Sequence, residues 1–249
     1  MRRVILPDSH GSLADPKAVS AALRIIKVWK PDEIVLLGDC VDASGIYSRL
    51  PAVNCDDAKY SPANDFAKAK AYLGRVRDAA PKADIHYLEG NHEEHIDRWI
   101  ANNIKDENER EVFRSTMGCF SRLNLGGYGI FYYPRTLVNV GVTVPGFLRL
   151  DGCLFTHGEG ASKHATSLLL DRHRQNIVHG HTHRAVCLSK RMLDGNPIIA
   201  ACPGTLSKLQ MFYNHTSLTE WTHGVGLQEW NGKLWHFNVA IQDGEYRLP

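Results

Sequence analysis

Short apolar runs alternate with amphipathic helical patterns through the first two thirds of the chain, which predicts β–α–β units around a largely parallel sheet. Strands are expected at Val4–Leu6, Glu33–Leu37 and Asp84–Leu88. Asp15-Pro16 and Ser61-Pro62 each supply a capping side chain and a first-turn proline, which predicts the start of a helix. These helices are expected to end near Lys30 and Pro81, and a third is expected just after Gly90-Asn91-His92.

From about Gly126 the pattern becomes richer in short β-type segments. Strands are expected over Tyr128–Tyr133, Leu137–Val144, Leu148–Thr156, Ile177–His179, Ala185–Leu188 and Ile198–Cys202. One helix is expected from about Ser162 to His173. Near the end, Gly226–Trp230 and Lys233–Ile241 flank Asn231-Gly232, which predicts a hairpin closed by a type I′ turn. Since the sequence contains neither a repeat nor a linker, residues 1–249 are predicted to form a single α/β domain.

The composition is that of an ordinary globular protein, and it disfavours several functional classes. Hydrophobic residues make up 43% and charged residues 22%, and the formal net charge is 29 − 27 = +2. Without a basic block, the chain is not expected to bind extended nucleic acid or a membrane surface, although a phosphate ester stays open as a substrate. No apolar run approaches the roughly 18–20 residues of a membrane span, and the N-terminal segment resembles a first strand more than a signal peptide. Six cysteines without a C-x-x-C pair predict buried free thiols and a cytoplasmic protein.

Polar side chains that can bind metals follow five apolar runs at the point where each run ends. These blocks are Asp8-Ser9-His10, Gly38-Asp39-Cys40-Val41-Asp42, Gly90-Asn91-His92-Glu93, His157-Gly158 and Gly180-His181-Thr182-His183. In α/β sheets, ligands lie beyond the carboxyl ends of the strands, where glycine allows tight turns and close approach. Because side chains alternate along extended backbone, Asp8 and His10 are predicted to point the same way, and so are His181 and His183.

The residue types in these blocks point to metal chemistry. Carboxylate, imidazole and amide oxygen, without thiolate, suit divalent Mn, Fe, Zn or Ni better than a structural zinc. Two aspartates, one asparagine and four histidines are too many for one tetrahedral ion, and are about right for two ions that share a carboxylate. Two ions roughly 3.5–4 Å apart can clamp a phosphoryl group and activate a water for in-line displacement. Taken singly, Asp39 and Asn91 also suit a helix cap or a turn, and His181-Thr182-His183 suits a polar loop.

The order D-x-H, G-D-x-x-D, G-N-H-E, His and G-H-x-H resembles the calcineurin-like metallophosphoesterase superfamily, over roughly residues 8–183. The resemblance implies a four-layer α/β/β/α sandwich of two mixed sheets. It also implies two divalent metal ions per chain, with Mn²⁺ preferred over Fe, Zn or Ni. The implied ligands of one ion are Asp8, His10, Asp39 and His183. The implied ligands of the other ion are the bridging Asp39 together with Asn91, His157 and His181.

The resemblance implies catalytic roles for two further side chains. His92 matches the family histidine that stabilises the phosphoryl charge and protonates the leaving group, and it precedes Glu93-Glu94, whose charges suit a helix start. Asp42 matches a carboxylate that orients a histidine, with His92 as one candidate. The protein Ser/Thr phosphatases of the superfamily carry Arg-Gly after this aspartate, whereas this chain carries Ala43-Ser44. Activity as a protein phosphatase is therefore not expected.

The predicted activity is metal-dependent hydrolysis of a small phosphate ester, with a phosphodiester of nucleotide type favoured. The expected mechanism is in-line attack of a hydroxide that bridges the ions, while His92 assists the leaving group. A phosphomonoesterase or a nuclease of the same family is the alternative, and a non-catalytic scaffold with this fold is a more distant one.

Other residues receive weaker predictions. His86, His223 and His236 are expected to be structural or exposed, His179 to be packed, and His95 is a candidate for lining the pocket. Cys40 is expected to pack beneath the metals without binding them. The polar segments at about Ala43–Ser61 and Asn214–Thr222 are candidates for the rim of the site.

Overall fold

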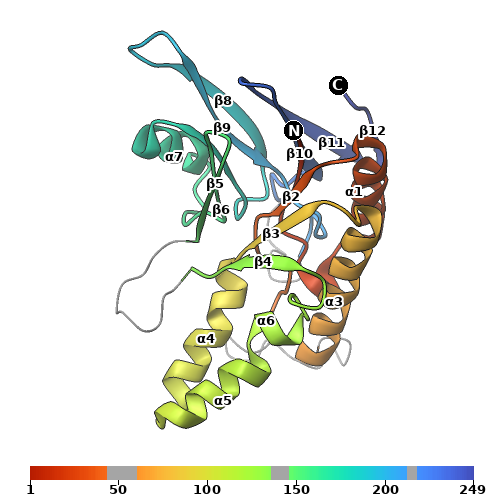
Figure 1. Ribbon diagram of the computed structural model, residues 1–249, viewed down its shortest axis with the longest axis vertical. Coiled ribbons are helices and arrows are strands. Elements are labelled where there is room, and N and C mark those ends of the chain that lie inside the picture. The colour runs from red at the N-terminus through yellow and green to blue at the C-terminus, as the bar shows by residue number, and fades with distance from the viewer. Residues whose placement is uncertain (44–60, 136–145, 212–217) are drawn as a thin grey trace.

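The computed structural model describes residues 1–43, 61–135, 146–211 and 218–249, and its strands form two sheets (Figure 1). The larger sheet contains β1 (Arg2–Leu6), β2 (Glu33–Leu36), β3 (Asp84–Leu88), β4 (Ile130–Tyr133), β10 (Gly224–Trp230), β11 (Leu234–Gln242) and β12 (Glu245–Tyr246). The smaller sheet contains β5 (Phe147–Leu150), β6 (Cys153–Thr156), β7 (Asn176–His179), β8 (Ala185–Arg191) and β9 (Pro197–Pro203). The strand orders are β12-β11-β10-β1-β2-β3-β4 and β5-β6-β7-β9-β8.

The described helices are α1 (Pro16–Trp29), α3 (Pro62–Ala79), α4 (Asn91–Asn103), α5 (Glu107–Met117), α6 (Cys119–Arg122) and α7 (Ala165–His173), with a 3-10 helix η1 (Gly11–Leu13). Four of them, α1, α3, α4 and α7, begin close to the predicted starts. The Asp15 carboxylate accepts the N–H groups of Lys17 and Ala18, and the Ser61 hydroxyl accepts that of Asn64. Both predicted caps are confirmed, each with proline in the first turn. No described helix is long and apolar enough to cross a membrane.

Both sheets are mixed. Strands β1 to β4 run parallel, which confirms the predicted β–α–β organisation, while β10 lies antiparallel beside β1. In the smaller sheet, β6, β7 and β9 run parallel, and β5 and β8 run antiparallel at the two edges.

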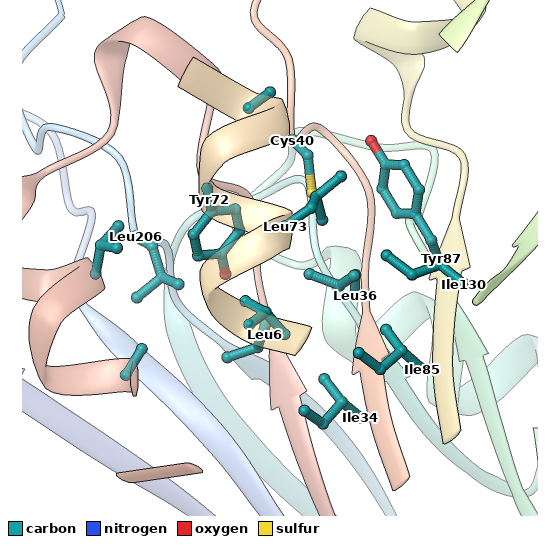
Figure 2. Packing of buried hydrophobic residues seen from close by; sticks show 14 of the residues in the cluster. Leu6, Ile34, Leu36, Cys40, Tyr72, Leu73, Ile85, Tyr87, Ile130 and Leu206 are labelled. Atoms are coloured by element: carbon teal, nitrogen blue, oxygen red, sulfur yellow. The ribbon is translucent and has the colours of Figure 1, made fainter. Parts of the chain in front are cut away.

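Three clusters of buried apolar side chains separate four layers. On the outer face of the larger sheet, Leu6 and Leu36 pack with Leu73 of α3 (Figure 2). Between the sheets, residues such as Ile5 of the larger sheet pack with Phe155 of the smaller sheet. The third cluster lies under α7, on the other face of the smaller sheet. The predicted α/β/β/α sandwich is confirmed.

This layering explains why the first strands read as unbroken apolar runs. In β1, Val4 and Leu6 face the helices, whereas Ile5 between them faces the second sheet. Strands buried on both faces need apolar residues at every position rather than at alternate ones.

The structure corrects the sequence prediction in the β-rich part. The single strand predicted over Leu148–Thr156 is a hairpin, β5–β6, because Asp151 and Gly152 both have positive φ, 45° and 72°. Asp-Gly is a known signal for such a turn, and it was overlooked. The strand predicted over Leu137–Val144 lies outside the described residues, and helices α5 and α6 had not been predicted.

The C-terminal hairpin is present, but its turn differs from the prediction. Trp230 pairs with Leu234, so three residues form the loop, and only Gly232, at φ 92°, is left-handed. A type I′ turn needs positive φ at both central residues. The hairpin extends the larger sheet beside β1.

The described cysteines are free thiols, as predicted, but not all are buried. Cys40, Cys119, Cys153 and Cys202 are buried, whereas Cys187 is exposed on β8. β8 is an edge strand of the smaller sheet, and none of its residues is buried. Cys55 lies outside the described residues.

Candidate metal centre

The nine side chains predicted to act in the site lie at the carboxyl ends of strands. Asp8 and His10 follow β1, Asp39 and Asp42 follow β2, Asn91 and His92 begin α4 after β3, His157 follows β6, and His181 and His183 follow β7. The backbone N–H of His181 donates to Asp8 at 3.0 Å, which joins the strand ends of the two sheets. Asn91, His92 and His181 are partly buried, and the other six are buried.

Asp8, His10 and His183 form one cluster, in which the potential ligand atoms lie within 4.8 Å of one another. The Nε2 atom of His183 is 3.1 Å from Oδ2 of Asp8 and 3.2 Å from Nε2 of His10. A carboxylate oxygen and two imidazole nitrogens therefore converge on one buried point.

Asp39, His157 and His181 form a second cluster, also within 4.8 Å. The Nε2 atom of His157 is 3.3 Å from Oδ2 of Asp39 and 2.9 Å from Oδ1 of Asn91. The same Oδ2 of Asp39 is 3.9 Å from Nε2 of His10, which belongs to the first cluster. One carboxylate therefore lies between the two clusters, where a bridging ligand would be needed.

Left-handed backbone directs several of these side chains. His10, Asp39, His181 and His183 have φ values of 51°, 48°, 67° and 59°. Residues other than glycine rarely adopt this conformation, and where they do so at functional sites the surrounding structure holds them in it. The prediction that His181 and His183 point the same way along extended backbone is wrong, because the left-handed turns send them to different clusters.

Two glycines in the predicted blocks are required by space. A Cβ atom on Gly90 would lie 2.0 Å from Oδ1 of Asp39. A Cβ atom on Gly38, whose φ is +102°, would lie 2.7 Å from the backbone of Gly90. Glycine therefore lets the segments after β2 and β3 approach closely enough for Asp39 and Asn91 to reach the same cluster.

Asp42 lies beside the two clusters, and His92 forms a third group with His10 and Asp39, in which the potential ligand atoms also lie within 4.8 Å of one another. The Asp42 carboxylate is 3.0 Å from Nδ1 of His10, so it orients that ring with Nε2 toward His183. His92 is oriented differently, because its Nδ1 donates to the backbone carbonyl of Asp42. Its Nε2 faces Oδ2 of Asp39 at 3.9 Å, and its side chain is 20% exposed. His92 therefore lies on the solvent side of the site, where a substrate can reach it.

Glu93 has a role that the sequence analysis missed. It is buried and accepts the backbone N–H groups of Asp39, Cys40 and Gly90 at 3.0, 2.7 and 2.9 Å. It ties the segment after β2 to the start of α4, as the third-position glutamate of a capping box does. The available signal was its spacing, three residues after the helix cap.

Asp65 is a second buried carboxylate that the sequence analysis missed. It accepts backbone N–H groups from Ser12 and Asp42, each at 2.8 Å, and from Ala43 at 3.1 Å. These bonds hold the segments after β1 and β2 against the first turn of α3. No sequence signal distinguished it, because an acidic residue in a first helical turn is common.

The donor atoms of the second cluster fit a divalent metal ion. Nδ1 of His157 is 2.8 Å from the backbone carbonyl of Leu37, which can only accept, so Nδ1 carries the proton. Nε2 therefore faces the oxygens of Asp39 and Asn91. A cation belongs between Nε2 and these oxygens: a proton on Nε2 in the metal-free protein, which the raised pKa of His157 reflects, or a metal ion that takes the place of that proton. A carbonyl partner on the far ring nitrogen is typical of metal-binding histidines.

The electrostatics of the site also favour cations. Although burial opposes it, Asp39 raises the pKa of His157 to about 9, and the contact with Asp42 raises the pKa of His10 to about 9. Burial lowers the pKa of His181 to about 4, so this imidazole is neutral at pH 7 and ready to bind a metal ion, whereas His10 and His157 would each release a proton when an ion binds. Although burial opposes it, the charge of His157 holds the pKa of Asp39 well below its usual value.

Most of the remaining histidines contact residues outside the two clusters. The partners are Tyr133 for His86, Thr166 for His179, the Ser207 carbonyl for His223 and Asn238 for His236. The His95 ring lies closer to the site, with its centroid 5.7 Å from that of His92. Cys40 is buried and belongs to neither cluster.

Trp221 is a neighbour of the site that the sequence analysis did not single out. Its ring centroid is 4.3 Å from that of His183, edge to face. It belongs to the segment Asn214–Thr222 that was predicted as a rim, of which residues 214–217 lie outside the described residues. The other predicted rim segment, Ala43–Ser61, lies almost wholly outside them.

Two layers of sheet between helices, with carboxylates and imidazoles gathered at the strand ends, define a metallophosphoesterase fold and site. The sequence model of the calcineurin-like phosphoesterases matches residues 1–185, and this chain belongs to that family. The family is dimetal-dependent, and membership supports metal-dependent hydrolysis of phosphate esters. Among curated proteins, no sequence matches this chain.

Two solved structures are similar to this chain at low identity. YfcE, a phosphoesterase from E. coli, is 17% identical with a TM-score of 0.42, and the match covers 99% of this chain and 96% of YfcE. TT1561 of Thermus thermophilus is 12% identical with a TM-score of 0.38, and the match covers 95% of this chain and 98% of TT1561.

Proposed function

We propose that this protein hydrolyses small phosphodiesters of nucleotide type with two divalent ions, Mn²⁺ being preferred. The main support is the position of Asp39, whose Oδ2 lies 3.3 Å from His157 and 3.9 Å from His10, between two clusters of potential ligands. Asp8, His10, Asp39 and His183 would hold one ion. Asp39, Asn91, His157 and His181 would hold the other. When bound, the ions supply positive charge to the phosphoryl group and activate the attacking water.

His92 would transfer the proton to the leaving oxygen. Its Nδ1 is held by the Asp42 carbonyl, so Nε2 is the nitrogen that can exchange a proton with substrate. Direct binding of both Asn91 and His92 to one ion is sterically awkward, because adjacent side chains usually diverge. The partial exposure of His92 supports the same role. A well-placed general acid contributes roughly 10²–10⁴-fold to the rate.

The preference for diesters is inferred from residues 43 and 44. Where protein Ser/Thr phosphatases have Arg-Gly, this chain has Ala43-Ser44, so that position offers no guanidinium to a dianionic monoester. We therefore expect diesters to be hydrolysed at least as well as monoesters. We further propose that the protein is located in the cytoplasm, and the free thiols support this because the cytoplasm is a reducing compartment. We also propose that residues 1–249 form a single domain.

The test is a metal titration followed by a substrate panel. After dialysis, elemental analysis should find close to two ions per chain in protein reloaded with Mn²⁺. Bis-p-nitrophenyl phosphate should be hydrolysed with Mn²⁺ and not with a chelator present. Cyclic nucleotides, p-nitrophenyl phosphate, phosphoserine peptides and short oligonucleotides complete the panel.

Each outcome distinguishes the proposal from an alternative. A strong preference for p-nitrophenyl phosphate would favour a monoesterase, and rapid cleavage of oligonucleotides would favour a nuclease. Two bound ions without hydrolysis of any substrate would favour a binding role for this fold. Binding of a single ion would contradict the bridging position of Asp39.

A further inference from the structure

Arg135 is a cation beside the site that neither the predicted blocks nor the mechanism uses. It lies just after β4, and β4 pairs in parallel with β3. Its place in the sheet is therefore next to the segment that begins α4 with Asn91 and His92. Its backbone N–H donates to the carboxylate of Glu89, the residue that follows β3. This hydrogen bond holds the backbone of Arg135 beside the end of β3.

The guanidinium of Arg135 is held between two parts of the site. Nη1 donates to the carbonyl of Gly158 at 3.2 Å, and Nε is 3.4 Å from Oε2 of Glu94. Gly158 directly follows His157, and Glu94 follows His92 by two residues. With 15% of its side chain exposed, Arg135 is pinned rather than free in solvent. Among the described residues, Nη2 has no hydrogen-bond partner.

Arg135 shares its carboxylate partner with a second arginine. Glu94 contacts Arg98 at 2.8 Å as well as Arg135, so two guanidinium groups share one carboxylate. Arg98 is 61% exposed and its charge is screened by water, whereas Arg135 is largely buried. A partly desolvated guanidinium with an unused edge is a strong binding group for phosphate oxygens.

We propose that Arg135 binds a non-bridging oxygen of the scissile phosphate. This role rests on the proposed function, because it assumes a phosphate ester at the two clusters. Diesters and monoesters both have such an oxygen, so this contact would bind the phosphate without selecting between the two classes of ester. Glu94 and Gly158 would hold the guanidinium in place before the substrate arrives, so that little side-chain entropy is lost on binding.

The experiment measures binding of inorganic phosphate to the Mn²⁺-loaded protein by calorimetry, in wild type, Arg135→Gln, Arg135→Lys and Arg98→Gln. A charge-assisted hydrogen bond is worth roughly a tenfold to hundredfold change in affinity. Arg135→Gln should weaken phosphate binding by about that factor. Arg135→Lys should lose less, because it keeps the charge without the fork of donors. Arg98→Gln is the matched control, and it should bind phosphate as wild type does.

The same variants are then assayed with bis-p-nitrophenyl phosphate, and their metal content is measured. Arg135→Gln should raise KM by a similar factor at wild-type metal content. Unchanged phosphate affinity in a folded, metal-loaded Arg135→Gln protein would overturn the role. So would a loss that occurs only together with loss of metal, since Arg135 would then serve to hold the Gly158 segment. If Arg135→Gln does not fold, equal phosphate affinity in wild type and Arg135→Lys would overturn it.

Failure of the proposed function gives a different result. If wild type hydrolyses no ester but Arg135→Gln still loses phosphate affinity, the phosphate contact stands and the proposed reaction is wrong. If both variants at position 135 bind phosphate as wild type does while the ester is hydrolysed, the reaction stands and the contact is wrong.

Discussion

The Asp39 side chain contacts residues of both clusters. Its Oδ2 atom faces Nε2 of His157 at 3.3 Å and Nε2 of both His10 and His92 at 3.9 Å, while its Oδ1 accepts the backbone N–H of His92 at 3.0 Å. One oxygen is thus directed into the site and the other is held by the start of α4. A residue in this position affects both clusters at once.

Asp39→Asn should therefore remove most of the bound metal and nearly all activity, because it removes the negative charge that both ions need. Elemental analysis of the dialysed protein measures the metal directly. Asp194→Asn, in the exposed turn between β8 and β9, is the control and should keep two ions. Two ions retained in Asp39→Asn would show that this carboxylate does not bridge.

His92→Ala should keep both ions and near-normal substrate affinity, while kcat for a poor leaving group falls by roughly 10²–10⁴-fold. The loss should shrink with p-nitrophenol, which leaves readily without a proton. Steady-state kinetics with an alkyl and a p-nitrophenyl ester give the comparison, with the exposed His164→Ala as control. An equal loss for both leaving groups would contradict general acid catalysis, and loss of metal would make His92 a ligand.

Sequence analysis identified residues whose side-chain type and position at the end of a predicted strand indicate metal binding. All nine predicted side chains lie in or beside the two clusters, although their roles as ligands and acids stay predictions. Glu93, Asp65 and Arg135 were missed because their partners are backbone groups or segments that only the folded chain brings near. A buried carboxylate that accepts main-chain N–H groups has the same sequence signature as an exposed one.

At the scale of elements, the caps show how local sequence sets a boundary. Asp15 Oδ1 accepts the backbone N–H groups of Lys17 and Ala18 at 2.9 Å each, just ahead of the first turn of α1. Helices α1 and α3, which combine a capping side chain with a first-turn proline, were predicted, whereas α5, which begins after the cap Asp106 without a proline, was not. The β5–β6 turn has a local signal, Asp151-Gly152, from which the hairpin could be predicted. The position of the last hairpin in the sheet has no local signal, because it depends on pairing with β1.

Asp15→Ala should lower the free energy of unfolding by roughly 0.5–2 kcal/mol, since two N–H groups of α1 lose their acceptor. Asp15→Asn keeps an oxygen in the same place and should lose much less. Urea denaturation followed by circular dichroism measures both. Equal losses for the two variants would mean that the charge, and not the cap, stabilises the helix.

At the scale of the whole molecule, polar side chains link the two sheets as well as apolar ones. Asn238 on β11 donates to the carbonyls of Val186 and Cys202 on the smaller sheet, at 3.1 and 2.9 Å. Its Oδ1 is 2.9 Å from Nε2 of His236, so that nitrogen carries a proton. Nδ1 of His236 then faces the Gln228 amide at 3.4 Å as an acceptor, so the neutral ring fits this place.

Acid should weaken the fold through this histidine. Burial lowers the pKa of His236 to about 4, below the model-peptide value of 6.5. Between these two values the unfolded chain binds a proton that the folded chain does not, so the free energy of unfolding falls as the pH drops from 6.5 toward 4. His236→Gln should lose less stability than wild type between pH 7.5 and pH 5, by denaturation at each pH. An identical loss in both proteins would contradict this role, and the exposed His164→Gln serves as control.

The two strands that pair with β1 determine when the larger sheet can form during synthesis. On one side β1 pairs with β2, some thirty residues later, but on the other it pairs with β10, so that Arg3 lies opposite Gln228. A ribosome therefore releases β1, the strand that leads to Asp8 and His10, long before one of its two partner strands exists. Until β10 emerges, β1 is an open sheet edge able to pair with foreign strands. We expect stalled nascent chains that end before β10 to recruit chaperones and to bind metal poorly, although every proposed ligand has already been synthesised.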